Sequence, residues 1–388
     1  MPFAALACAL VLADPAAAAG DEAATEPIAP VALAVGTERL PTVLVQGHYA
    51  NAVGTSDAAS QGSVTSKLIE SRPTLRPAEV LEFVPGVIVT QHSGDGKANQ
   101  YFLRGFNLDH GTDFATFVDG MPVNMPSHAH GQGYSDLNWL IPELVDRIDY
   151  KKGPYFAEEG DFASAGAAHI RQFASLPAGI TSATIGQRGY GRALVASSST
   201  LGDGELLYAL EGAHNDGPWT HPEKFHRGNG LVRYSFGSDA SRTSVTALAY
   251  TAGWNATDQI PQRAVDAGVL GRFDALDPTD GGRTSRFSLS LDTRRTDDDG
   301  TWKLGAYAIA SSLDLYSNFT GFLDNPMAGD QFEQAEHRRV FGGAVSRDWS
   351  ATLAGRPTTW TLGLQLRHDR LDPVGLYSTA ARQRVAST

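Results

Sequence analysis

The sequence predicts an N-terminal α+β domain followed by an antiparallel transmembrane β-barrel. Short helix, strand and turn signals are mixed between residues 77 and 170. After Ala178 the pattern changes to successive strands of roughly ten residues, with no helical periodicity between them. Short and long connections alternate between these strands, which is typical of the periplasmic turns and outer loops of outer-membrane barrels.

Composition limits the classes of function. The chain has 388 residues and a net charge of −12, which argues against nucleic acid as a partner. Its single cysteine, Cys8, excludes an intramolecular disulfide framework. The sequence contains no window of 18 or more uninterrupted apolar residues, so we expect no transmembrane helix.

The first domain begins with a helix signal. Pro77 suits the first turn of a helix, and Pro85-Gly86 ends that helix after Val84. Asp119-Gly120 predicts a tight turn after a strand, and a long loop from Met121 to Tyr134 follows it. The expected strands are Val87–Thr90, Tyr101–Phe106, Phe114–Val118, Leu144–Tyr150 and a last one near His169 and Ile170.

Six short motifs follow one another in this segment. They are Pro85-Gly86-Val87, Leu103-Arg104-Gly105, Val118-Asp119-Gly120, Pro142-Glu143 with Val145 and Ile148, Lys152-Gly153, and Gly166. Each is weak by itself, but their order over about 90 residues resembles the plug domain of TonB-dependent outer-membrane receptors. The resemblance implies a plug domain over residues 48–175, with a small soluble α+β domain as the alternative.

The N-terminal residues have the composition of an exported protein. Residues 1–20 are apolar and alanine-rich, which indicates a signal peptide cleaved near Ala19. Residues 21–40 are rich in Ala, Pro and Glu, so we expect a flexible leader over residues 21–47. This leader ends in an isolated β-prone run that resembles the TonB box of the family and could add as a strand to a partner's sheet, unless it is simply a first plug strand. The run consists of Thr42, Val43, Leu44, Val45 and Gln46.

Residues 176–388 are expected to form the N-terminal part of the barrel. Three strands alternate cleanly between apolar and polar residues: Leu231–Phe236, Arg286–Asp292 and Trp360–Arg367. An apolar face toward lipid and a polar face toward a wet lumen explain this pattern, although a β-sandwich has the same period. We count about nine strands where the family barrel has about 22, so we expect a truncated chain that ends inside the barrel.

Connection lengths favour the barrel over the sandwich. Compact soluble domains seldom need repeated loops of 20 to 30 residues, roughly the length of the longer connections here. Tight turns are expected at 202–204, 238–241, 297–300 and 354–357, and long connections at 215–228, 253–283 and 317–336.

Catalytic motifs give little support for an enzyme. The sequence has no Gly-x-Ser-x-Gly elbow, no His-Glu-x-x-His motif and no phosphate-binding loop. His128 and His130 resemble the first metal motif of amidohydrolases, but that fold needs helices between its strands, and residues 178–388 predict none. We therefore expect no enzymatic activity and no cofactor.

The loops that follow the plug strands carry the candidate binding site. The resemblance implies that these loops face outward. Because imidazole is a common ligand of Zn, Cu and Ni, His128 and His130 are predicted to bind a metal. The alternative is that the loop residues are polar and pack against the barrel wall. The ligand-binding candidates are His92, His110, Asn124, Met125, His128 and His130.

The resemblance implies active transport of a scarce solute across the bacterial outer membrane. The expected partners are TonB, outer-membrane lipid and an extracellular solute. The chain is acidic and its candidate loops offer only Lys97 as a cation, which favours a divalent metal or a neutral or cationic metal complex over an anionic ferric siderophore. Two alternatives stay open: a passive receptor or pore without energy coupling, and a periplasmic metallohydrolase that uses His128 and His130.

Overall fold

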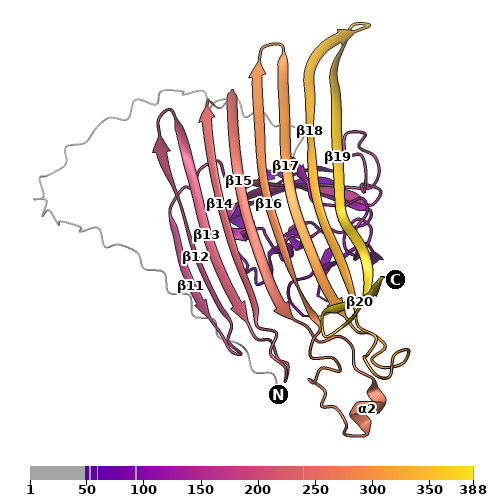
Figure 1. The fold of residues 1–388 in the computed structure, drawn as a ribbon. Coiled ribbons are helices and arrows are strands. Elements are labelled where there is room, and N and C mark those ends of the chain that lie inside the picture. Colours follow the sequence, from indigo (N-terminus) through magenta and orange to yellow (C-terminus); the bar gives the residue numbers. More distant parts are fainter. Residues whose placement is uncertain (1–48, 52–53, 59, 92–93, 239, 388) are drawn as a thin grey trace, which may run out of the picture.

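The computed structural model describes residues 49–387 except 52–53, 59, 92–93 and 239. Figure 1 shows the first domain, in purple, against one face of a tall antiparallel sheet. The described residues form a seven-stranded, a three-stranded and a ten-stranded sheet. The two smaller sheets belong to the first domain, and the largest sheet contains every strand after residue 179.

The seven-stranded sheet is the framework of the first domain. Its strand order is β1-β2-β3-β9-β10-β7-β8, and only β10 and β7 run parallel. Its strands are β1 (Tyr49–Asn51), β2 (Gly54–Ala58), β3 (Gln61–Thr65), β7 (Phe114–Val118), β8 (Met121–Pro122), β9 (Val145–Lys152) and β10 (Gly166–Gln172). The three-stranded sheet consists of β4 (Val87–Thr90), β5 (Gln100–Leu103) and β6 (Phe106–Asn107).

Short helices connect these strands. The predicted helix is a 3₁₀ helix, η1 (Pro77–Phe83), and it ends before Pro85 as expected. Glu79 caps its start, because the Glu79 carboxylate accepts the backbone N–H of Arg76 at 3.3 Å. The other helices of the domain are α1 (Ser66–Ile69) and η2 (Pro142–Leu144). In the described part of the chain, no helix combines the length and hydropathy needed to span a bilayer.

The predicted turn at Asp119-Gly120 connects β7 to β8. Both residues have a positive φ, 48° at Asp119 and 80° at Gly120, as a two-residue hairpin turn requires. Val118 pairs with Met121 across this turn. The Asp119 carboxylate also accepts the backbone N–H of Gln172 at 3.0 Å, so the turn is fixed to the end of β10.

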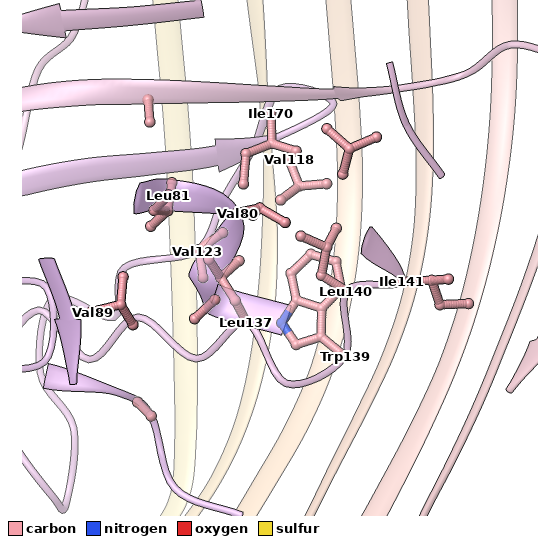
Figure 2. Close-up of a cluster of buried hydrophobic side chains, with 14 of the residues drawn as sticks. Val80, Leu81, Val89, Val118, Val123, Leu137, Trp139, Leu140, Ile141 and Ile170 are labelled. Carbon is pink, nitrogen blue, oxygen red and sulfur yellow. The ribbon is translucent and has the colours of Figure 1, made fainter. Parts of the chain in front are cut away.

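The core of the first domain lies between its strands and the segment before η2. Figure 2 shows the side chains of this cluster, with Trp139 at its centre and Ile170 and Val118 from the sheet above it. Trp139 is 2% exposed, and its indole N–H donates to the carbonyl of Asp136 at 2.7 Å. The guanidinium of Arg286 from the large sheet lies 4.5 Å from the centre of the Trp139 ring. The core of the first domain therefore contacts the large sheet through a cation–π interaction between Arg286 and Trp139.

The large sheet has ten strands, one more than the sequence predicted. Each strand pairs antiparallel with the next along the chain, and in the described residues β11 and β20 are its two edges. The strands are β11 (Ile180–Ile185), β12 (Gly191–Leu201), β13 (Gly204–Asn215), β14 (Phe225–Gly237), β15 (Ser241–Asn255), β16 (Gly281–Asp297), β17 (Gly300–Ser317), β18 (Phe332–Leu353), β19 (Arg356–Ala380) and β20 (Gln383–Ser387).

The tight turns predicted from the sequence and the long connections lie at opposite ends of this sheet. The pairs Leu201 with Gly204, Asp297 with Gly300 and Leu353 with Arg356 close hairpins where the sequence predicted short turns. At the other end, near α2 (Gln262–Asp266) in Figure 1, lie the longer connections. These connections are shorter than predicted because the strands continue into them. In particular, β18 begins at Phe332, inside the loop expected to reach residue 336.

The two faces of the sheet differ in polarity as the alternation predicted. Val232 is 50% exposed, whereas its neighbour Arg233 is 4% exposed because it faces the first domain. Leu289 is 55% exposed between Ser288 and Ser290, which are 8% and 6% exposed. The outer face is therefore apolar and the inner face polar, the arrangement of a sheet with lipid outside and a wet lumen inside.

Candidate functional site

The loop between β8 and η2 carries most of the predicted site residues. Asn124 organises the loop from within, because its side chain is buried and bonded to the backbone on both sides. Its amide nitrogen donates to the carbonyls of Gly111 and Phe114 at 2.9 and 3.0 Å, and its oxygen accepts the N–H of Thr116 at 2.7 Å. These bonds give Asn124 a structural function, so we leave it out of the proposed ligand set.

Met125 joins the two ends of the loop through its backbone, and its side chain does not lie on the surface of the loop. Its backbone N–H donates to the Tyr134 carbonyl at 3.0 Å, and its carbonyl accepts the N–H of Gly133 at 2.8 Å. The side chain is buried, and its sulfur lies 3.7 Å from a guanidinium nitrogen of Arg367 on β19. The thioether therefore faces the barrel wall, and we leave Met125 out as well.

His128 is held flat against an aromatic ring. Its imidazole stacks on Tyr134 with a centroid distance of 4.0 Å. Its Nδ1 accepts the backbone N–H of His130 at 3.1 Å, and its Nε2 lies 3.8 Å from the Glu336 carboxylate. Burial, helped by His130 and Arg338, lowers the pKa of His128 to about 3, so this imidazole is neutral.

His110 and His130 approach each other through ring nitrogens. Their Nε2 atoms lie 3.1 Å apart, and their ring centroids are 4.6 Å apart. The Nδ1 of His110 lies 3.1 Å from each of the carbonyls of Ala98 and Asn99. The Nδ1 of His130 lies 2.8 Å from the side-chain oxygen of Gln334. Thus His130, predicted to pair with His128, faces His110 through its Nε2.

Three polar residues of β18 hold this loop and were not predicted as site residues. Gln334 donates to the Ala129 carbonyl at 3.1 Å, and Glu336 accepts the Ala129 N–H at 2.9 Å. Arg338 donates to the Ser127 carbonyl and, at 2.6 Å, to Glu336. All three alternate along one face of the strand. This alternation is present in the sequence, but the sequence pattern predicts a long connection over residues 317–336.

The structure does not describe every predicted residue. His92 and the proposed TonB box, Thr42 to Gln46, fall outside the described residues. Lys97 is buried, 3.8 Å from Asp258, and burial lowers its pKa. Among the residues that the structure describes, no group of three or more His, Cys, Asp or Glu side chains is arranged to hold a metal ion.

Ion pairs attach the first domain to the sheet on the side of β12 to β14. Arg192 binds Glu143 of η2 with two hydrogen bonds of 2.6 and 2.8 Å. Arg233 pairs with Asp119 and donates to the carbonyls of Gln172 and Phe173 at 3.0 and 2.7 Å. The domain is therefore held to the polar face of the sheet by charge-assisted hydrogen bonds.

Known proteins with the same arrangement are outer-membrane receptors. The family description "TonB-dependent Receptor Plug Domain" matches residues 55–167. The ferric citrate transporter FecA in its unliganded form is similar with a TM-score of 0.67 at 14% identity, over 85% of this chain and 50% of that chain. The copper transporter OprC has a TM-score of 0.60 at 16% identity, over 86% and 49%. The siderophore receptor PirA from Acinetobacter baumannii has a TM-score of 0.58 at 16% identity, over 82% and 49%.

These similarities confirm the predicted fold class. The chain spans about half the length of the solved structures that it matches. It combines the plug match with an antiparallel sheet of ten strands, as a plugged barrel requires. Residues 55–167 therefore match a TonB-dependent receptor plug domain, and the chain has the fold of the TonB-dependent receptors of the bacterial outer membrane.

Proposed function

We propose that the receptor imports a metal ion or a small metal complex across the outer membrane, powered by TonB. The observation that carries this proposal is the contact between the His110 and His130 imidazoles, beside Gln334 near the start of β18. Imidazoles are common ligands of Zn, Cu and Ni. The proposed function is transport and not catalysis.

The charges around the plug loops support a cationic or neutral solute. Arg338 and Arg367 both face the loop, but each is paired with Asp369. Lys97 lies beside Asp258. These cations are already balanced by carboxylates, so an anionic complex would find little net attraction here. The names of similar structures cover both kinds of cargo, since OprC is a copper transporter and PirA a siderophore receptor.

The polar contacts between plug and sheet support a plug that can move relative to the sheet. Charged and polar side chains form much of the described contact between plug and sheet, including Arg192, Arg233 and Gln334. Water can replace hydrogen bonds of this kind when the plug is pulled, whereas it cannot compensate a separated apolar core. A pull from the periplasm could therefore free the plug without unfolding the sheet.

Coupling to TonB is proposed to use the segment from Thr42 to Gln46. A Leu44→Pro receptor should still bind its solute but lose energised uptake, because proline removes a backbone donor and fixes φ where a strand must pair with TonB. The measurements are equilibrium binding to cells and accumulation of the same solute over time. Leu33→Pro is the matched control, since it places the same substitution in the leader outside the segment.

Two results would contradict this assignment. Unchanged uptake by the Leu44→Pro receptor would mean that coupling uses another segment or that transport is passive. Equal loss of uptake in the Leu33→Pro control would mean that the leader as a whole, and not residues 42–46, is required.

A further inference from the structure

We propose that His110 and His130 form a two-imidazole site for a divalent transition-metal cation such as Zn²⁺, Cu²⁺ or Ni²⁺, held through their Nε2 atoms. This inference takes its biological meaning from the proposed function, but it concerns binding and can be tested without transport. It replaces the predicted pair, His128 and His130, with a pair that is brought together by the fold.

The first step of the argument is the placement of protons on the two rings. The Nδ1 of His110 faces two carbonyl oxygens at 3.1 Å, so this nitrogen carries the proton. The Nδ1 of His130 faces the oxygen of Gln334 at 2.8 Å, and it carries its proton for the same reason. The Gln334 amide is oriented independently, because its nitrogen donates to the Ala129 carbonyl at 3.1 Å.

The second step follows from the chemistry of imidazole. A neutral imidazole has one N–H, so a ring protonated at Nδ1 presents a lone pair at Nε2. The two Nε2 lone pairs then face each other 3.1 Å apart. Two lone pairs at this distance repel each other, and a cation bound to both turns this repulsion into attraction while both Nδ1 hydrogen bonds are kept.

The third step is the fit of a metal to this distance. A cation about 2.1 Å from each Nε2, the usual Zn–N distance, would bind both nitrogens at 3.1 Å with an angle of about 95°. That angle suits two adjacent positions of an octahedral or distorted tetrahedral ion. The hydrogen bonds at both Nδ1 atoms are the second-shell contacts that orient metal-binding histidines in general.

The neighbouring groups narrow the class of cation. The Asp109 carboxylate lies 3.8 Å from the Nε2 of His110, and its side chain is 57% exposed, so it can approach a bound ion from the solvent side. Imidazole with carboxylate suits Zn²⁺, Cu²⁺ and Ni²⁺. The sulfur of Met125 faces Arg367, which argues against a thioether site for Cu⁺. His110 and His130 therefore supply two nitrogens, and other ligands fill the further positions of the ion.

The test is calorimetric titration of the purified receptor, expressed from its own gene, with Zn²⁺, Cu²⁺ and Ni²⁺ salts. His110→Asn and His130→Asn are the test variants, because the asparagine amide can replace Nδ1 as a donor while Nε2 is lost. Each variant should weaken metal binding by at least about tenfold, the lower end of the effect of losing even a second-shell partner. By electron paramagnetic resonance, the Cu²⁺ complex of each variant should show one coordinated nitrogen fewer than the complex of the unmodified receptor.

Two control variants separate this site from other histidines. His214→Asn changes a half-exposed histidine elsewhere in the receptor and should leave binding unchanged. His128→Asn keeps an acceptor for the His130 N–H and should also leave binding unchanged. The saturated EDTA complexes of the same metals should not bind, because they have no position open for imidazole.

The proposal is overturned if the receptor binds none of the three metals, or if His110→Asn and His130→Asn bind them as the unmodified receptor does. Loss of binding in His128→Asn with retention in His110→Asn would instead assign the site to His128 and His130. None of these results depends on TonB. Loss of uptake with intact metal binding would contradict the proposed transport and leave this site standing.

Discussion

In the Arg233→Met receptor, the free energy that holds the plug against the sheet should fall by about 3 kcal/mol. The substitution leaves the Asp119 carboxylate without its charged partner. Arg233 is 4% exposed. Its guanidinium forms an ion pair with Asp119 and donates hydrogen bonds to the carbonyls of Gln172 and Phe173. Methionine fills much of the same volume but donates nothing to these three groups. We expect earlier protease cleavage of the plug and increased entry of large antibiotics through the barrel.

The control for this substitution is Arg295→Met on β16. The Arg295 side chain is 68% exposed and lies 3.9 Å from Asp297, so its loss should change stability by about 0.5 kcal/mol or less. If Arg233→Met and Arg295→Met give the same protease sensitivity and the same antibiotic entry, the contact between Arg233 and the plug does not hold the plug in place.

The Leu289→Arg receptor should fold into lipid less stably by about 2–4 kcal/mol, the cost of an arginine on the lipid face near the bilayer midplane. Leu289 is 55% exposed and pairs with Ala247 and Ala308 on the adjacent strands. In register with it across the sheet, Tyr208, Val232 and Phe341 are also exposed, which indicates a continuous apolar belt. Urea titration of the receptor in lipid vesicles measures the change.

Leu201→Arg is the matched control, because it makes the same change at the same exposure but at a different depth. Leu201 is 54% exposed and ends β12 at the tight turn to β13. An arginine near the interface should cost about 0–1 kcal/mol. Equal costs at positions 201 and 289 would contradict the assignment of this face to lipid.

Local signals predicted the elements of the fold well. The structure confirms the strands Val87–Thr90 and Phe114–Val118 at the predicted bounds. It also confirms the turn at Asp119-Gly120, where the backbone conformation favours the residues present. Strand alternation in β14 and β16 predicted which residues face lipid, because a strand's two faces follow from sequence order alone. These features depend on residues within a few positions of one another.

The site could not be predicted in the same way, because its contacts join distant parts of the chain. His110 and His130 meet although 20 positions separate them, and Gln334 reaches His130 from a strand more than 200 positions later. Sequence proximity suggested His128 with His130, but the Nδ1 of His128 accepts a hydrogen bond from its own loop. Asn124 was a ligand candidate because it is polar, and only the fold shows that the backbone uses its amide atoms.

The most direct test of the transport proposal is accumulation of radiolabelled Zn²⁺ and Cu²⁺ by cells that express the receptor from its own gene, with and without a functional TonB. We predict concentrative uptake that requires both the receptor and TonB, with surface binding retained when TonB is absent. Equal uptake in cells with and without TonB would contradict the account, because it would make the receptor a passive pore. Absence of receptor-dependent uptake of either ion would likewise contradict the proposed metal cargo.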